Sequence, residues 1–447
     1  MSVLQRLWTS SSKDKQKSDK QLIPDVEDPA DGQPYNPYTE ILILQHHKDI
    51  VRLILPIDDF RCATAGDDSK VVIWDIQDGC SLHVLSGHDH PITCMIIHGE
   101  IILTASSDKT IRVWDIFNGQ CLHILKEHCS SVKSLVSIPE STLFVSGGRD
   151  ICLWNENGQL LKTLQRTDTE EDICIMISIN HNRIVTAADK QLVVFSVTPV
   201  DDDEDKDVNS EMSLIKSLPP HREVIHSLIK VSKSCFASGS IDGMIVLWTA
   251  HNLLPAKYFN TITNYQGADK LYPYSIQCMF CLQEQYLFAA IGSGFGIFDV
   301  SASKDGLICR KISAHFSKIL NIGMTRDGSY MLTSSEDGSI RLWGKPPSSD
   351  PEINEKLNNS NIPMEKFTRL SSEELKRLNG ENCIEPELLG EFIAHSGAVQ
   401  TFVDYDKEGI VSCGADGLVI VWKNSELQKV KRNRMVAGIL SNHDGIV

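Results

Sequence analysis

The stretch GDDSKVVIWD at residues 66–75 decides the fold, because related copies of it recur along the chain. Each copy joins a polar turn to a short apolar run that closes on a large aromatic residue. The copies end at Trp74, Trp114, Trp154, Phe195, Trp248, Phe298, Trp343 and Trp422, which are 40, 40, 41, 53, 50, 45 and 79 residues apart. A repeating unit of about 40–45 residues buries its apolar face only by stacking on its neighbours, so one repeat architecture is expected.

This pattern, with Gly-His near the start of a unit and Trp-Asp near its end, resembles the WD-repeat family of β-propellers from about residue 38 to residue 423. The resemblance implies an all-β fold: a single propeller of eight blades, with a short C-terminal helix. The fourth and sixth units lack the His, and Gly292 replaces the turn Asp of the sixth. A seven-bladed ring, with one of these copies misread, is the alternative.

The chain also carries a candidate closing strand. Residues 39–45 (TEILILQ) alternate like a strand but precede the first His of the repeat, so they have no blade of their own. No strand-like run follows Trp422. We therefore expect 39–45 to supply the outer strand of the eighth blade, which closes the ring and removes an open sheet edge.

The family pattern assigns a hydrogen-bonded tetrad to most blades: a His, a Ser or Thr, an Asp and the Trp. The matching sets are His47, Thr64, Asp68, Trp74; His88, Thr104, Asp108, Trp114; His221, Ser238, Asp242, Trp248; His315, Thr333, Asp337, Trp343; and His395, Ser412, Asp416, Trp422. The third blade offers His128, Ser146, Asp150 and Trp154, but its turn is two residues shorter, which leaves the reach of Asp150 open. Buried polar groups need partners, so these residues are expected to be structural.

A His, an Asp and a Ser together also suggest a nucleophilic catalyst, but this trio recurs in blade after blade, whereas an enzyme builds such a site once. The sequence contains no nucleophile elbow, P-loop, zincin or kinase signature. Cys278 and Cys281 form the only close cysteine pair, and without a second pair we expect buried strand thiols. We therefore predict no enzyme activity, no cofactor and no metal.

Composition limits the class of partner. The 447 residues carry 43 Lys and Arg against 59 Asp and Glu, a formal charge of −16 that argues against nucleic acid. No apolar run approaches the roughly 18 residues of a membrane span, and the first residues lack the apolar core of a signal peptide. Thirteen cysteines without disulfide-like spacing suit a reducing compartment. A cytoplasmic protein is expected.

Two insertions interrupt the propeller. The loop 198–212 contains DDDEDKD and is expected to be a solvated acidic loop. The long loop of blade seven, 345–390, opens as a linker and continues as FTRLSSEELKRLNG, in which Ser371 and Glu374 match a capping box and Gly380 a helix stop. The apolar residues of this short helix must rest on the propeller or on a partner, and both remain open. They are Phe367, Leu370, Leu375 and Leu378.

The two ends of the chain differ from the ring. Residues 1–37 are expected to form a flexible arm with a basic start. Residues 424–447 are expected to form a helix and tail, because NSELQKVKRNRMVAGIL begins with a helix cap and combines an irregular apolar stripe with basic residues. A basic amphipathic helix docks on a partner or on a membrane surface, or packs under its own domain. We expect docking on another protein.

Within the WD-repeat family, NPYTEILIL (36–44), HHKDIVR (46–52) and FIAHSGAVQ (392–400) resemble the propeller subunits that assemble with two DENN-domain proteins. Those partners are the chromosome 9 open reading frame 72 protein and the Smith–Magenis chromosome region candidate 8 protein. The resemblance implies a non-catalytic adaptor that contacts the second partner through the closing strand and the C-terminal helix. The residues implied in that contact are Ile41, Ile43, Leu427, Val430, Arg434, Met435, Ile439 and Leu440.

The resemblance also implies a location. Such an adaptor tethers its complex to lysosomes when amino acids are scarce, through a PQ-loop cationic amino-acid transporter, and so supports small-GTPase regulation and autophagy. The long loop of blade seven, with Phe367, Leu370, Leu375 and Leu378, would make the transporter contact. Two alternatives are a cytosolic adaptor of other partners and a substrate receptor of a cullin-type ubiquitin ligase. The second usually carries W-D-x-R, where this chain has Gln77 and Phe117 at the Arg position.

Overall fold

The structure of the chain is a computed structural model. It describes residues 36–433 except 140, 166–170, 181, 199–209, 261–273, 303–305, 347–351, 353–354, 356–358 and 379–382. Most of the predicted N-terminal arm, the centre of the acidic loop and the end of the C-terminal helix therefore lie outside the described residues.

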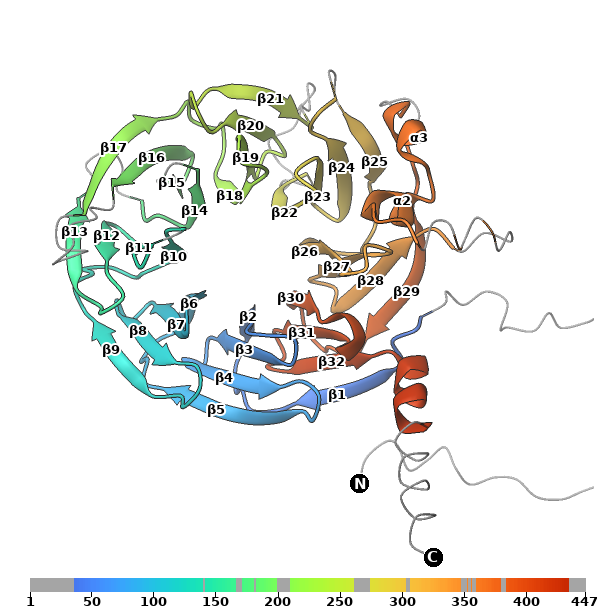
Figure 1. Ribbon diagram of the computed structural model, residues 1–447, viewed down its shortest axis with the longest axis horizontal. Helices are drawn as coiled ribbons and strands as arrows, with labels where there is room; N and C mark the ends of the chain where they lie inside the picture. The colour runs from blue at the N-terminus through green and yellow to red at the C-terminus, as the bar shows by residue number, and fades with distance from the viewer. Residues whose placement is uncertain are drawn as a thin grey trace, which may run out of the picture. The chain divides into compact units, whose positions relative to one another are not determined.

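The described chain forms eight four-stranded antiparallel sheets arranged around a ring, as Figure 1 shows. Blades one to four contain β2 (Val51–Pro56), β3 (Arg61–Gly66), β4 (Lys70–Asp75), β5 (Cys80–Ser86); β6 (Ile92–His98), β7 (Ile101–Ser106), β8 (Ile111–Asp115), β9 (Cys121–Leu125); β10 (Ser134–Ser137), β11 (Phe144–Gly147), β12 (Ile151–Trp154), β13 (Leu160–Leu164); and β14 (Ile175–Ile179), β15 (Arg183–Ala188), β16 (Gln191–Thr198), β17 (Glu211–Ser217).

The remaining blades follow the same order. Blades five to eight contain β18 (Ile225–Lys230), β19 (Cys235–Ser240), β20 (Ile245–Thr249), β21 (Pro255–Phe259); β22 (Ile276–Leu282), β23 (Tyr286–Ile291), β24 (Gly294–Asp299), β25 (Leu307–Lys311); β26 (Ile319–Met324), β27 (Met331–Ser335), β28 (Ser339–Gly344), β29 (Glu387–Ile393); and β30 (Val399–Asp404), β31 (Ile410–Gly414), β32 (Val419–Lys423) with β1 (Glu40–Leu44). The eight-bladed prediction is confirmed, and the weak fourth and sixth copies are regular blades.

The ring closes through its two ends. The strand β1 lies at the outer edge of blade eight and pairs antiparallel with β32, with Ile41 opposite Trp422 and Ile43 opposite Ile420. The predicted closing strand is therefore confirmed. Along β1 the odd-numbered residues Ile41 and Ile43 face outward, whereas Leu44 is fully buried, as the two-residue period of a strand requires.

The hydrophobic core is divided among the junctions between blades. At the closure, for example, Leu44, Val72, Trp74 and Val421 pack in one cluster, so blades one and eight share a continuous core. The inner three strands of the blades supply most of the buried apolar residues, whereas outer strands such as β9 are mostly exposed. Stacked blades bury their faces only against each other, and this explains why a ring of repeats is stable where one repeat is not.

The described part of the blade-seven insertion includes two short helices, α2 and α3, where one was predicted. The first, α2 (Pro363–Thr368), begins with Pro at the start of the helix, and α3 (Ser372–Lys376) has the predicted capping box of Ser371 and Glu374. The helix α3 ends at Lys376, before Gly380, which lies outside the described residues. The insertion returns to the ring through a bridge between Ile384 and Cys309 of β25, and residues 387–390 already belong to β29.

Boundaries at the acidic loop also differ slightly from expectation. Thr198 is the last residue of β16, and Glu211 and Met212 begin β17, so the loop is shorter at both ends than 198–212. The alternation of the strands continues up to these residues, with Met212 buried against the core. The acidic residues themselves lie outside the described residues.

Candidate functional site

The tetrad of blade one shows how the recurring polar residues of the repeat are hydrogen-bonded. The indole N–H of Trp74 donates to Thr64 Oγ1 at 2.7 Å, and Thr64 Oγ1 lies 2.8 Å from His47 Nε2. The other imidazole nitrogen, Nδ1, lies 2.9 Å from a carboxylate oxygen of Asp68. A ring that donates from Nδ1 to the carboxylate accepts the threonine hydroxyl at Nε2, so every polar atom is satisfied.

Three further blades repeat this network. The sets are His88, Thr104, Asp108 and Trp114 in blade two; His315, Thr333, Asp337 and Trp343 in blade seven; and His395, Ser412, Asp416 and Trp422 in blade eight. We call the face of the ring that carries these networks the tetrad face. Its turns join the second and third strands of each blade, and its loops lead from one blade to the next.

Electrostatics agree with a structural role for the tetrads. Burial lowers the pKa of His88, of His315 and of His395 below the ordinary imidazole value, although the neighbouring carboxylates oppose this. The pKa of Asp108 falls to about 2: burial would raise it, but hydrogen bonds from Thr110 and His88 outweigh that effect. The neutral imidazole lies between a fixed carboxylate and a hydroxyl that already accepts the indole N–H. Each of its hydrogen bonds therefore has a structural role.

Blades three and five have incomplete tetrads, and for blade five this corrects the sequence assignment. His221 Nε2 lies 2.7 Å from Ser238 Oγ, but Asp242 binds Ser240 and the Met244 amide instead, and His221 Nδ1 has no hydrogen-bond partner among the described residues. Burial lowers the pKa of His221 to about 4.

In blade three, His128 Nε2 lies 2.6 Å from Ser146 Oγ, whereas the carboxylate of Asp150 accepts the Cys129 thiol and does not reach the imidazole. The shorter turn explains this.

The strongest candidate for a functional surface lies at the closure of the ring. The outward side chains of β1, Ile41 and Ile43, are 48% and 44% exposed. On the helix at residues 425–433, Leu427 and Val430 are 39% and 45% exposed. We call these four side chains the closure patch. Apolar side chains of this size that remain exposed together are typical of protein contact sites.

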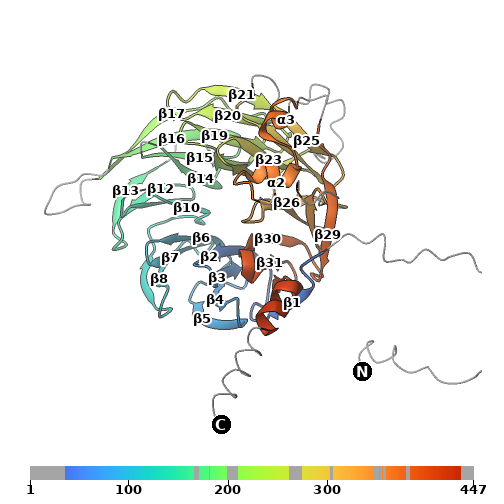
Figure 2. The ribbon, with the colours of Figure 1, turned by 45° about the vertical axis from the view of Figure 1, so that its right-hand side comes forward.

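Specific bonds place the start of that helix beside β1, and Figure 2 shows the two elements side by side. The Asn424 side chain accepts the amides of Glu426 and Leu427, and the Ser425 amide donates to the Pro37 carbonyl at 3.1 Å. Asn424, and not Ser425, is therefore the cap of this helix. The patch therefore joins two segments from opposite ends of the chain.

Two ion pairs connect the helix to the blade and were not foreseen. Arg432 pairs with Glu40 of β1 at 2.5 Å, and Lys431 pairs with Glu408, in the turn between β30 and β31, at 2.8 Å. The basic run of the helix was visible in the sequence, but its acidic partners could be found only from the ring topology. Arg434, Met435, Ile439 and Leu440, which were also expected to bind a partner, lie outside the described residues.

The apolar residues of the blade-seven insertion are placed differently from that expectation. Phe367 and Leu375 are buried in the cluster that joins blades six and seven, and Leu370 and Leu378 are partly buried against it. The ring of Phe367 meets that of Phe288 edge-on, with centroids 6.3 Å apart. These four side chains therefore pack on the propeller and do not form an exposed apolar contact face. What α3 presents outward is polar: Glu373, Lys376 and Arg377.

Other candidate sites are structural where the chain is described. Cys278 and Cys281 lie on β22, and their thiols contact Asn321 and the Val231 carbonyl respectively. In the described ranges no three His, Cys, Asp or Glu side chains gather as a metal site requires. Of the helices that the structure describes, none is long and apolar enough to cross a membrane.

Comparisons with known proteins point to one family. A family model described as WDR41, for a β-propeller, matches residues 4–432. The WD repeat-containing protein 41 of Homo sapiens is 33% identical over 434 residues, covering 90% of this chain and 90% of that protein. Its counterpart from Mus musculus is 31% identical over 436 residues, covering 90% and 91%.

Solved structures share the architecture. The crystal structure of the computationally designed Ika8 protein has a TM-score of 0.63 at 19% identity, and the match covers 85% of this chain and 98% of that one. The structure of U3-55K has a TM-score of 0.51 at 18% identity, covering 66% and 90%. At such identities the likeness concerns the fold alone.

Proposed function

Because the chain belongs to the WDR41 family of WD-repeat propellers, we propose that it is the scaffold subunit of a complex with two DENN-domain proteins. WD-repeat propellers are in general non-catalytic scaffolds, and this chain is a WD-repeat adaptor. The finer proposal is that the closure patch contacts the Smith–Magenis chromosome region candidate 8 protein. The chromosome 9 open reading frame 72 protein would then join through that partner.

The observation that supports this proposal is the exposure of Ile41 and Ile43 on β1 and of Leu427 and Val430 on the helix that is bonded to the start of that strand. Fully burying an aliphatic side chain contributes roughly 1.5–3 kcal/mol, so four half-exposed ones offer a substantial gain on binding. The side of β1 away from β32 is also a sheet edge, which a partner strand could extend. An apolar patch with a fixed helix base beside it is the arrangement expected of a preformed contact site.

We also propose that the adaptor tethers its complex to lysosomes under amino-acid starvation through a PQ-loop cationic amino-acid transporter. Any effect on small GTPases and autophagy would then come from the DENN pair. Because the apolar residues of the insertion pack inward, the contact is assigned to the polar outer face of α3, with Glu373, Lys376 and Arg377. Charged rim contacts of this kind set specificity and association rate more than affinity.

Quantitative co-purification from starved cells tests both parts. The full chain is compared with a truncation after Lys423 and with a Lys376→Glu/Arg377→Glu variant, which leaves the buried side of α3 intact. We expect the truncation to lose both DENN proteins and the charge reversal to lose only the transporter. Deleting 345–390 is unsuitable, because it would remove α2, α3 and the start of β29.

Two results would contradict the proposal. Recovery of both DENN proteins with the truncated chain would remove the closure patch from the contact. Absence of both from the full chain, together with recovery of a cullin-ligase adaptor, would replace the scaffold by a substrate receptor.

A further inference from the structure

Blade six departs from the other blades on the tetrad face. Strand register places Ala289 and Phe298 where the Thr and Trp of a tetrad stand in blade seven, and both are buried. The turn that follows β23 runs through Gly292 and Ser293, without an Asp. The blade is held by apolar packing, so its end on the tetrad face is free of the polar network that occupies this position elsewhere.

A second difference lies on the third strand of the blade. In blades two and seven this strand carries an arginine, Arg112 or Arg341, opposite the tetrad Thr. Both guanidinium groups reach the carbonyl of the loop that enters the blade, Gly87 or Ala314. In blade six the same register position is Gly296, opposite Ala289. Phe298 and Ile291 close the space beside this glycine, so no side chain from this position reaches the loop that enters the blade.

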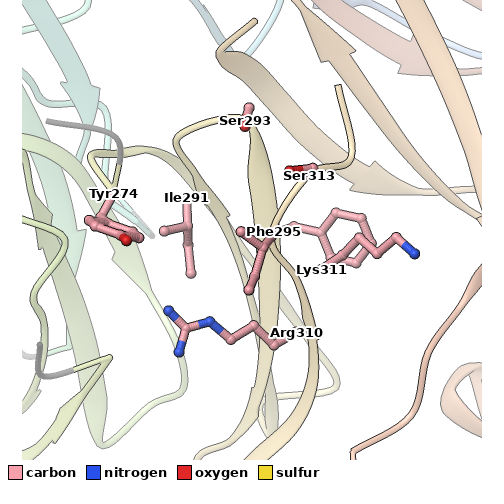
Figure 3. Close-up of a pocket in the computed structure, with 8 residues that line it drawn as sticks. Tyr274, Ile291, Ser293, Phe295, Arg310, Lys311 and Ser313 are labelled. Atoms are coloured by element: carbon pink, nitrogen blue, oxygen red, sulfur yellow. The ribbon is translucent and has the colours of Figure 1, made fainter. Parts of the chain in front are cut away.

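A hollow lies at this end of blade six, with a volume of about 130 Å³. Six of the residues that line it are Tyr274, Ile291, Ser293, Phe295, Arg310 and Ser313. Figure 3 shows Arg310 reaching from β25 toward Tyr274 and Ile291, whereas the Lys311 amine points the other way. A protein cavity of about 150 Å³ holds a benzene ring, so this blade-six hollow has room for a single side chain.

The charge around the blade-six hollow is positive although the chain as a whole is strongly negative. Arg310, Lys311 and Lys318 form no ion pair among the described residues. In blade seven, Glu391 pairs with Arg341 and Asp337 accepts the Phe316 amide. None of the residues that line the hollow is acidic, so an anionic group entering it would meet a guanidinium without a competing carboxylate in the lining.

An apolar rim adjoins the hollow on the loop between blades six and seven. Ile312, which also lines the hollow, is 71% exposed, and Phe316 is 91% exposed. The Phe316 amide donates to Asp337 of the blade-seven tetrad, and the Arg341 guanidinium lies 5.2 Å from the centre of its ring. Phe316 is therefore an exposed aromatic side chain in a fixed position, which is the form that contact residues take at protein interfaces.

We propose that the blade-six hollow and its rim bind an extended acidic segment of a partner protein. An Asp or Glu side chain of that segment enters the hollow toward Arg310, and a neighbouring aliphatic or aromatic residue packs on Ile312 and Phe316. A peptide is favoured over a lipid surface because the cationic site is a hollow with room for a single side chain beside two exposed apolar residues, and not a broad basic surface. This surface is separate from the closure patch and does not depend on the proposed complex.

The test selects peptides on the full-length protein. A phage-displayed library of random dodecapeptides is panned against the unmodified chain, with depletion on the Arg310→Glu/Phe316→Ala variant. The best sequence is then made as a fluorescent peptide, together with the same peptide carrying Gln or Asn for each Glu or Asp. Fluorescence anisotropy gives the dissociation constants. Lys233→Glu, the same charge change on the opposite face of blade five, is the matched control.

We expect acidic sequences with an adjacent apolar residue to be enriched. The selected peptide should bind the Arg310→Glu variant at least tenfold more weakly than the unmodified chain. The amide peptide should bind the unmodified chain with a similar loss. The Lys233→Glu variant should bind the selected peptide with unchanged affinity. Phe316→Ala, at a side chain that the fold does not bury, should weaken binding severalfold. Thermal melting shows that each variant is folded.

The proposal is overturned if no acidic motif is enriched, or if the selected peptides bind the Arg310→Glu variant as tightly as the unmodified chain. It is also overturned if the full chain binds phosphatidylserine vesicles in an Arg310-dependent way while no peptide competes. That outcome would assign the surface to a membrane.

Discussion

The blade-seven insertion and the C-terminal helix are both short helical additions to the same ring, yet they use their apolar residues in opposite ways. In the insertion, Phe367 and Leu375 enter the junction of blades six and seven and become part of its core. On the C-terminal helix, Leu427 and Val430 stay exposed beside Ile41 and Ile43. The first addition therefore completes the fold, and the second leaves a surface for another molecule.

An apolar stripe alone therefore does not reveal a binding site. What decides is whether the ring offers a gap to cover it. The junction of blades six and seven presents Phe288 and Met331 to the insertion. At the closure, Leu44 is already covered by blade one and Trp422 by blade seven, so nothing remains for the helix to fill.

The largest expected effect separates the two additions by stability. Phe367→Ala should lower the free energy of unfolding by about 3–5 kcal/mol, because it leaves a cavity in the junction between two blades. Val430→Ala, at an exposed position, should change it by less than about 0.5 kcal/mol. Chemical denaturation of both variants measures this. An equal loss of unfolding free energy in the two variants would show that the two additions contribute alike to stability.

Binding should show the reverse order. Leu427→Asp/Val430→Asp should weaken capture of the purified DENN pair more than about tenfold, because it places charges in a contact that must exclude water. The free energy of unfolding should stay nearly unchanged. Titration by biolayer interferometry gives the affinity, with Lys376→Glu/Arg377→Glu as a control that keeps binding. An unaffected dissociation constant for the double Asp variant would count against the closure patch.

Helix capping offers a finer comparison. Ser371 caps α3 and Asn424 caps the C-terminal helix. Ser371→Ala should cost about 1 kcal/mol of global stability, because α3 packs on the ring. Asn424→Ala should leave global unfolding nearly unchanged and instead raise amide hydrogen exchange within 425–433. Loss of global stability with Asn424→Ala would mean that this helix also supports the fold.

The smallest effect concerns the ion pair between Arg432 and Glu40. It is partly exposed, so breaking it should change stability by no more than about 1 kcal/mol. Glu40→Arg should nevertheless weaken partner binding severalfold, because the helix base loses its position beside β1. The double variant Glu40→Arg/Arg432→Glu restores the pair and should recover affinity. If the double variant binds no better than Glu40→Arg, the pair does not position the helix.

Much of the fold was predictable because its signals are local and repeated. The recurring Trp and the turn before it gave the number of blades, and the alternation in 39–45 gave the closing strand. The weak copies were also counted correctly as blades, since Phe195 and Phe298 keep a buried aromatic ring at the position of the missing Trp. Side-chain volume is enough to hold a blade together without the tetrad.

The remaining features depend on relations that no local pattern contains. The spacing of His221 and Asp242 matches a complete tetrad, but Asp242 instead binds the serine and the amide within its own turn. The sequence did not predict the helix α2, because its six residues carry no helix-start signal other than Pro363. The hollow of blade six is lined by side chains such as Tyr274, Ser293 and Arg310, which come from separate segments and share no local motif.

The closure by β1 also has a consequence during synthesis. Leu44 pairs with Val419, so about 375 residues must be made after β1 before its partner strand exists. At roughly 5–20 residues per second, the strand waits on the order of 20–75 s after leaving the ribosome. During that time its apolar residues and its backbone groups have no sheet to join. Among the described strands, the element at the proposed partner surface is therefore the first to be translated and the last to be paired.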